Sequence, residues 1–289
     1  MTSTNPDDWS PADHPYAIAV SEAQWWQRAA QLAVLRLRDD DDRRIAWFSS
    51  RQIDARQLVF ALRQLLNAER LEQVALSTLG MDQSVGAALS VALQGFTDAL
   101  PGIKHMRDAL MHFDEWSRGE GKFGPQKQRR DAGAALRDVA REYWGFGYDP
   151  SKGTISIGPY TISVDVADRA ATELSQAIYL AAHEVDRKNA AELRAKTVEA
   201  LASAGIRCDA PDGAVKVSPG NDFRIWITLS APDGSDDAER ERLAARIVAA
   251  LDCRGLRLES TCLAESFDSV ERLVRRETLY VAADRSVTE

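Results

Sequence analysis

The chain has 289 residues, of which 45% are hydrophobic and 28% charged, and its formal net charge is −8. This is the composition of a globular protein, long enough for one large domain or two ordinary ones. The acidic balance argues against nucleic-acid binding over the whole surface, so any RNA contact has to be local.

The N-terminal fifteen residues are polar and lack the basic start and apolar centre of a signal peptide. No apolar run approaches the roughly 20 residues that a bilayer span needs. We therefore expect a disordered lead over residues 1–15, no membrane partner and a cytoplasmic location. Reduced thiols are favoured over a disulfide framework or a zinc site, because the three cysteines are odd in number and unsuitably spaced (Cys208, Cys253, Cys262).

Apolar residues recur at helical spacing through the first part of the chain. They predict a helix over 21–37 with Ser21 as its N-cap, and further helices over 52–67, 69–79 and 84–99. Small residues in the last of these suit the centre of a helical bundle. The aspartates at 39–42 favour a solvated loop over a metal site, because consecutive acids rarely converge on one ion.

The next predicted helix starts at Pro101, ends at the glycine-containing segment 117–121, and carries Arg107, Asp108 and His112. Residues four apart share a helix face, so Asp108 lies beside His112 and can hold one imidazole nitrogen. Arg107 lies about 140° away from His112 around the helix. Within one chain only its long side chain could bring both groups to one phosphate, and a second copy of the helix would remove that difficulty.

Positive charge gathers in the segment that follows, residues 121–130. Lysines and arginines there are suited to grip phosphates, and an aromatic ring is available to stack on a base. The candidate RNA-binding residues are Lys122, Phe123, Lys127, Arg129 and Arg130. An ordinary exposed loop that leads into the next helix is the alternative.

Two alternating runs, 154–157 and 160–164, are joined by a Gly-Pro pair and predict a β-hairpin inserted between helices. A long helix over 167–204 closes a first domain, 16–204. Beyond it, turns separate predicted strands from predicted helices, which indicates a small α+β module over 205–289. The predicted strands are 223–229, 256–260 and 278–282, and the predicted helices are 236–250 and 267–274. The fold class is therefore mainly α, a helical bundle with an inserted hairpin and a C-terminal α+β module.

The pattern Arg-polar-x-x-x-His, formed by Arg107, Asp108 and His112 and continued by Phe113-Asp114-Glu115, resembles the signature of the HEPN superfamily. Many members of this superfamily of helical domains are metal-independent ribonucleases. The resemblance covers residues 16–190 at most and implies a HEPN-like bundle. It also implies a homodimer through the motif helix, in which two copies of the motif face each other across one cleft. The family often has asparagine after the arginine, whereas aspartate adds a negative charge here.

The resemblance implies a metal-independent endoribonuclease of the toxin or defence type that needs no cofactor and cleaves RNA through attack of the ribose 2′-hydroxyl. His112 would transfer the proton, Arg107 would bind the phosphate, and Asp108 would orient the imidazole. RNA and a second copy are the expected partners, and a cognate inhibitor protein is a further candidate. The alternative is a non-catalytic HEPN-like scaffold that binds RNA, nucleotide or a partner protein. If the motif is only a solvent-exposed helix face without a function, Arg107 is expected to pair with an acid such as Glu115.

Two further histidines are not assigned to the site. His105 precedes Arg107 by two residues, points to a different side of the helix, and is expected at the surface, with a position at the border of the cleft as the alternative. His183 lies on a helix rich in alanine and leucine, without a partner recognisable by spacing. An enzyme site in the C-terminal module is the last possibility, although its sequence offers no acid-base or nucleophile pattern.

Overall fold

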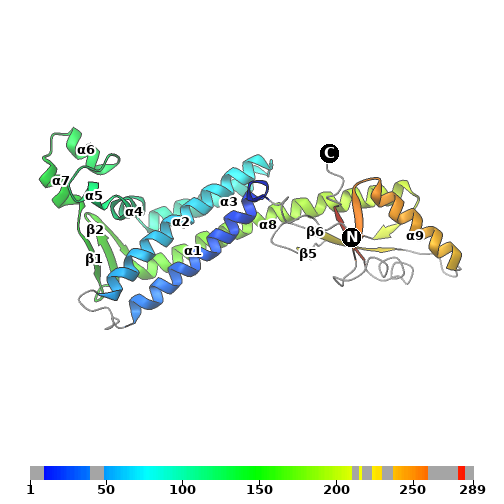
Figure 1. The fold of residues 1–289 in the computed structure, drawn as a ribbon, viewed down its shortest axis with the longest axis horizontal. Helices are drawn as coiled ribbons and strands as arrows, with labels where there is room; N and C mark the ends of the chain where they lie inside the picture. Colours follow the sequence, from blue (N-terminus) through cyan, green and yellow to red (C-terminus); the bar gives the residue numbers. More distant parts are fainter. Residues whose placement is uncertain are drawn as a thin grey trace. The chain divides into compact units, whose positions relative to one another are not determined.

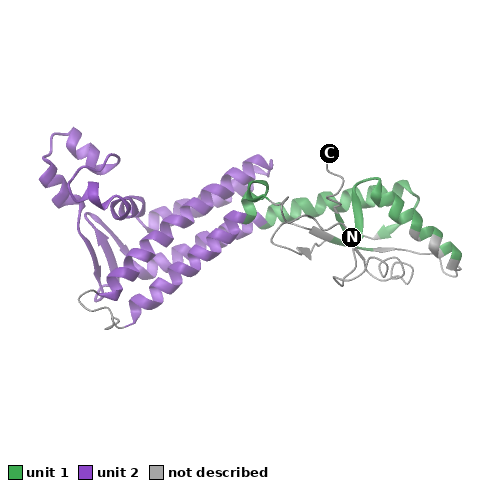
Figure 2. Ribbon diagram, viewed as in Figure 1, with its two compact units in different colours: residues 1–17, 183–289 green, residues 18–182 purple. Residues whose placement is uncertain are grey.

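A computed structural model describes residues 10–39, 49–209, 215–216, 223–229, 237–259 and 279–283. Helices dominate these residues and are accompanied by two small antiparallel sheets, which confirms the predicted fold class (Figure 1). The chain divides into two compact units (Figure 2). One unit is 18–182, and the other contains the described parts of 1–17 and 183–289. Within the described ranges, no helix combines the length and the apolar composition that crossing a membrane requires.

Long helices build the first unit: α1 (Pro15–Arg38), α2 (Ser50–Thr78), α3 (Gln83–Ala99) and α8 (Val164–Ser203), the last of which continues into the second unit. Their core consists of apolar residues three or four positions apart, such as Leu58, Leu62 and Leu65 of α2, all fully buried. Residues 10–15, predicted as part of a disordered lead, instead form a short 3-10 helix, η2 (Pro11–Asp13), and the start of α1. Residues 1–9 lie outside the described residues, as do the aspartates at 40–42.

Two predicted helix boundaries were wrong. Ser21 lies inside α1 and is not its N-cap, because the helix begins at Pro15. The separate helices predicted at 52–67 and 69–79 are one continuous helix, α2. Ala68 and Glu69 join them without a break, and both side chains are buried, so the inward face of the helix runs through the junction. The helix predicted at 84–99 is confirmed as α3, whose N-cap Asp82 accepts a hydrogen bond from the Ser84 backbone N–H at 2.8 Å.

The predicted motif helix is two helices, α4 (Ile103–Met111) and α5 (Phe113–Trp116). His112 lies between them with φ −114° and ψ 42°, outside the helical region. Pro101 is not the first helical residue, since Gly102 is the N-cap of α4 and has a left-handed φ of 80°. Glycine is required at this position for two reasons. The left-handed φ is strained for other residues, and a Cβ there would lie 2.1 Å from a ring carbon of Tyr160.

After α5 come two short helices, α6 (Pro125–Asp131) and α7 (Leu136–Tyr143), and then a three-stranded antiparallel sheet. Strands β2 (Thr154–Ile157) and β3 (Tyr160–Ser163) confirm the predicted hairpin, and Ile157 is opposite Tyr160. Strand β1 (Phe146–Asp149), which was not predicted from the sequence, pairs with β2. The sheet contacts α2 and α4, and so positions Tyr160 at the start of α4.

The second unit has strand order β4-β6-β8-β7, with β5 paired to β6. Its elements are β4 (Cys208–Asp209), β5 (Val215–Lys216), β6 (Phe223–Leu229), α9 (Asp237–Asp252), β7 (Leu256–Glu259) and β8 (Leu279–Ala283). Residues of α8, α9 and the sheet form its core, including Leu201, Ile225, Ile247 and Val281. The three predicted strands and the helix at 236–250 are confirmed, while the helix predicted at 267–274 lies outside the described residues.

Candidate functional site

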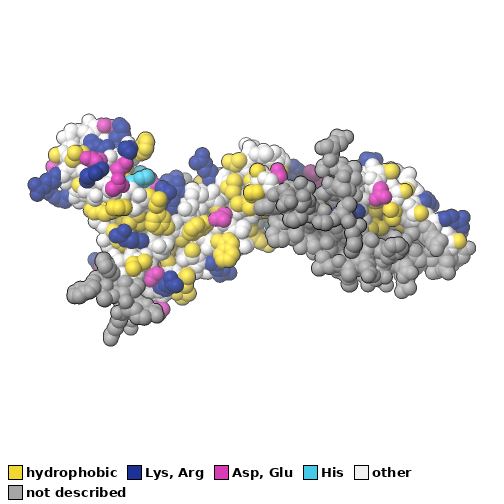
Figure 3. All heavy atoms as spheres, in the orientation of Figure 1, with side chains coloured by type: hydrophobic (Ala, Val, Ile, Leu, Met, Phe, Trp, Pro, Cys, Tyr) yellow, Lys and Arg dark blue, Asp and Glu magenta, His cyan; other side chains and the backbone are white. Residues whose placement is uncertain are grey.

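An open pocket of about 580 Å³ lies along α4, α5 and the loop that follows them. Helical spacing explains how α4 contributes to it, because residues three or four apart share a face. The pocket unites Asp108 and His112 of the motif with Lys122 and Phe123 of the basic segment. Histidine, acidic and basic side chains also lie together on the surface of this region (Figure 3). The lining residues are Lys104, His105, Asp108, His112, Glu115, Trp116, Lys122, Phe123 and Gly124.

Arg107 does not line this pocket. Its guanidinium pairs with Asp108 at 3.0 Å, and its Nε is buried without a hydrogen-bond partner. It lies close to Arg63 of α2, whose pKa is lowered by burial and then by the Arg107 charge. Glu115, the acid considered as a partner for Arg107, pairs instead with Lys122 at 2.6 Å. Within one chain, His112 therefore lines the pocket and Arg107 does not.

His112 is exposed at the junction of α4 and α5, and its backbone is held on both sides. Its N–H donates to the Asp108 carbonyl at 2.9 Å, and its carbonyl accepts from the N–H groups of Glu115 and Trp116 at 3.1 and 2.9 Å. Across the part of the chain that the structure describes, no hydrogen bond joins the Asp108 carboxylate to the His112 imidazole. Asp108 is engaged by Arg107 instead, so the expected orienting contact is absent from this arrangement.

His105 is half-buried and lines the pocket, although it was expected at the surface, with the border of the cleft as the alternative. Its ring stacks on Tyr160 with 5.2 Å between centroids and 26° between planes. Burial lowers the pKa of His105, and the Lys104 charge acts in the same direction against the opposing effect of Asp108. The 105, 108, 112 spacing indicates a shared helix face and was available from the sequence. The stacking partner, 55 residues away in the chain, was not.

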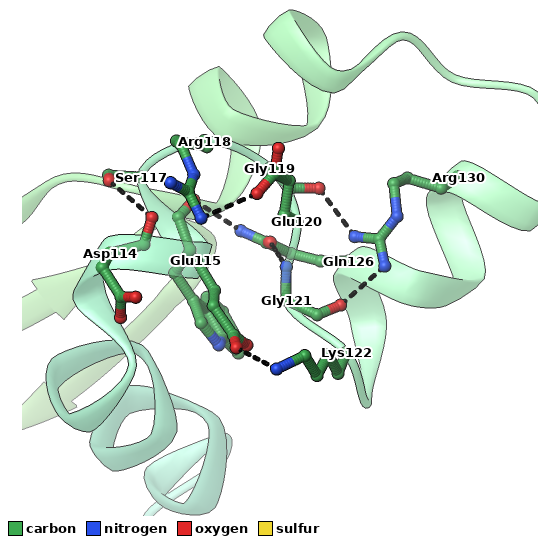
Figure 4. A network of polar contacts seen from close by, with 11 residues as sticks. Asp114, Glu115, Ser117, Arg118, Gly119, Glu120, Gly121, Lys122, Gln126 and Arg130 are labelled. Atoms are coloured by element: carbon green, nitrogen blue, oxygen red, sulfur yellow. Dashed lines mark hydrogen bonds and ion pairs between the residues drawn. The ribbon is translucent and has the colours of Figure 1, made fainter.

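The loop between α5 and α6 is held closed by buried polar contacts (Figure 4). Gln126 is fully buried; its Nε2 donates to the Trp116 carbonyl at 3.0 Å, and its Oε1 accepts from the Gly121 N–H at 2.9 Å. Arg130 donates to the carbonyls of Gly119 and Gly121 at 2.6 and 2.7 Å. These contacts hold the backbone of the loop next to Lys122 and Phe123, the two residues through which the loop lines the pocket.

The five predicted RNA-binding residues are therefore not equivalent. Lys122 and Phe123 line the pocket, and the Phe123 side chain is 83% exposed. Lys127 and Arg129 lie on α6 outside the pocket and form surface ion pairs, with Asp131 at 2.6 Å and Glu142 at 2.9 Å. Arg130 is bound to the loop carbonyls. An RNA-binding role for Lys127, Arg129 and Arg130 stays a prediction that the pocket does not support.

A second pocket, of about 740 Å³, lies between α1 and α8. Glutamines dominate its lining, together with the aromatic rings of Trp25 and Tyr179, and it contains no histidine or carboxylate. Acid-base chemistry is therefore better served by the first pocket. No group of three or more His, Cys, Asp or Glu side chains within the described ranges is arranged to hold a metal ion.

Comparison with known proteins adds no relative. No protein-family model matches the chain, and neither a curated protein nor a solved structure is found to be similar to it.

Proposed function

We propose that the α4–α5 pocket binds RNA and cleaves it without a metal ion, as an endoribonuclease of the toxin or defence type would. One observation carries the proposal. The pocket unites Asp108 and His112 of the motif with Lys122 and Phe123 of the basic segment, so that proton-transfer, phosphate-binding and base-stacking groups share one surface.

Binding of a single strand is supported by the lining of the pocket. Lys104 and Lys122 supply positive charge for phosphate oxygens, although Lys122 also forms an ion pair with Glu115. The exposed ring of Phe123 offers a stacking platform, and such stacking contributes about 1 to 3 kcal/mol per base. An open pocket on an acidic protein fits the expectation that RNA contact is local.

Cleavage requires the 2′-hydroxyl to lose a proton as its oxygen attacks phosphorus, and the leaving 5′-oxygen to gain one. The exposed imidazole of His112 is suited to proton transfer at this surface, a contribution of roughly 100- to 10,000-fold in rate. The role that we propose for Arg107 differs from the expected one, which was phosphate binding. By pairing with Asp108 it offsets the carboxylate charge that would otherwise repel the phosphate.

A homodimer through the motif helix remains part of the proposal. Met111 and Phe113 flank His112 and expose 47% and 59% of their surface, a feature that burial against a second copy would explain. In such a dimer the Arg107 side chain of one protomer could approach the pocket of its partner. A cognate inhibitor protein is a further prediction and would be expected to cover the same surface.

The test is incubation of the purified protein with total RNA in the presence of EDTA, followed by mapping of the cleaved ends. We expect 2′,3′-cyclic phosphate ends from the wild type, and their loss in His112→Ala. His183→Ala, which removes a histidine far along α8, is the matched control and should cleave normally. Intact RNA with the wild type, or equal cleavage by His112→Ala, would contradict the proposal.

The second candidate is a non-catalytic scaffold that binds RNA. It is favoured by Arg107, which pairs with Asp108 but does not itself line the pocket, and by the missing hydrogen bond between Asp108 and His112. This candidate predicts RNA binding that is weakened in Phe123→Ala, with no cleaved ends under any condition. Binding and end mapping on the same preparations separate the two candidates.

A further inference from the structure

The pocket contains a second imidazole that the motif does not account for. We propose that His105 is the general base of the reaction, which accepts the 2′-hydroxyl proton while His112, as general acid, protonates the leaving 5′-oxygen. This inference rests on the proposed function and specifies how one chain would divide the two proton transfers.

Two neighbours fix the His105 ring. One face stacks on Tyr160, whose own ring lies against Gly102 at the start of α4. The Nδ1–Cε1 edge faces the backbone of Gly124, where an added Cβ would lie 3.3 Å from both atoms. A ring held on its face and one edge loses little further freedom when substrate binds, which is what an efficient proton acceptor needs.

Burial favours the neutral form of the His105 ring. Burial is the main cause of its lowered pKa; Lys104 of the same helix adds to the effect, and Asp108 opposes it. Tyr160 on β3 has a pKa raised chiefly by burial, so its hydroxyl remains uncharged near neutral pH. Lys122, on the loop side of the pocket, is paired with Glu115. A neutral imidazole near pH 7 can accept a proton at once.

The two histidines also have a suitable separation. They are seven residues apart, which corresponds to about 10 Å along a helix axis at 1.5 Å per residue. Both histidines line the one pocket, and a spacing of this size leaves room for one phosphodiester linkage between them. Asp108 lies between the two histidines in the sequence and lines the same pocket.

The proposed step balances without another reactant. The O2′–H proton moves to His105 as the O2′–P bond forms, the P–O5′ bond breaks, and the O5′ atom takes a proton from His112. The products are a 2′,3′-cyclic phosphate and a 5′-hydroxyl. His105 has then gained a proton and His112 has lost one, and exchange with water restores both. A second copy of the chain is not needed to supply either imidazole.

The test uses an RNA that the wild type cleaves at a mapped linkage, and the same RNA with sulfur in place of the 5′-bridging oxygen at that linkage. A thiolate leaves without being protonated, so the sulfur substrate relieves the need for a general acid but not for a general base. His105→Gln, His105→Phe and His112→Gln are compared with the wild type. His105→Phe keeps an aromatic ring for stacking on Tyr160, which separates a lost base from a disturbed fold, and His183→Gln is the matched control.

We expect both His105 variants to cleave at least about 100-fold more slowly than the wild type on both substrates. His112→Gln should be equally slow on the oxygen substrate and close to the wild type on the sulfur substrate. His105 variants within about threefold of the wild type on the oxygen substrate would overturn the inference and leave the ribonuclease proposal standing. Rescue of His105→Gln by sulfur to the same extent as His112→Gln would also overturn it. A wild type that cleaves neither RNA would contradict the proposed function itself.

Discussion

The side chain of Gln126 offers the sharpest test of how the pocket is built, because it satisfies two buried backbone groups at once. Gln126→Ala leaves the Gly121 N–H and the Trp116 carbonyl without these partners. The Trp116 carbonyl still accepts from the Gly119 N–H at 3.1 Å, so only the Gly121 N–H is orphaned. An orphaned buried polar group costs about 1 to 3 kcal/mol, and the loop should be destabilised by that amount. Since Lys122 and Phe123 follow directly on Gly121, we expect RNA binding to weaken as well.

Hydrogen–deuterium exchange of peptides covering residues 117–126 measures this effect locally. A loss of about 1 to 3 kcal/mol corresponds to exchange that is about 5- to 150-fold faster. Gln128→Ala is the matched control, because it removes an exposed glutamine from the same helix and should leave exchange nearly unchanged. If the two variants exchange alike, the buried contacts of Gln126 do not hold the loop, and the reasoning fails.

The remaining predictions concern two glycines, a buried acid and the proposed dimer. Gly102→Ala should destabilise the protein by about 1 to 3 kcal/mol in urea unfolding, because φ is 80° and the new Cβ meets the Tyr160 ring. Gly95→Ala, in a helix with nothing within 4 Å of a Cβ, should instead stabilise it by about 0.5 to 1 kcal/mol. Burial raises the pKa of Glu69, so Glu69→Gln should raise the melting temperature at pH 7. Phe113→Glu should dissociate the homodimer in sedimentation analysis.

The pH dependence of the effect of Glu69→Gln tests whether burial of the carboxylate is its cause. The pKa of this carboxyl is higher in the folded than in the unfolded protein. Its contribution to stability is therefore complete below the unfolded-state pKa and is lost as pH rises through the folded-state pKa. The gap in melting temperature between Glu69→Gln and the wild type should be largest at neutral pH and shrink toward about pH 4. A gap that does not change with pH would contradict this origin.

Helices were predictable wherever packing and local sequence agree. The apolar spacing of α3 and the strand alternation of β2 and β3 gave elements that the structure confirms, and the spacing over α2 predicted helix but with a break that the structure does not contain. Helix ends were harder, because they depend on contacts that are distant in sequence. The non-helical backbone of His112 and the left-handed Gly102 both lie in a segment whose periodicity suggests one helix.

The candidate site could be predicted only in part, because several of its contacts join residues that are distant in sequence. The four-residue spacing of Asp108 and His112 identified two residues that do line one pocket. Arg107 lies near Arg63 of α2, 44 residues earlier in the chain, and no local pattern predicts that proximity. His105 was missed because burial by Tyr160 and the Gly124 loop arises only when the hairpin folds against α4. Likewise, only the folded loop shows that Arg130 binds backbone carbonyls.

One NMR titration tests the central claim, that the α4–α5 pocket is the RNA site. The chain has four histidines, His14, His105, His112 and His183, so its imidazole Cε1–H resonances can each be assigned by substitution. We expect a 2′-deoxy oligonucleotide, which cannot be cleaved by this route, to shift the resonances of His105 and His112 together and to leave the other two in place. Shifts confined to His14 or His183, or no shift at saturating oligonucleotide, would contradict the claim.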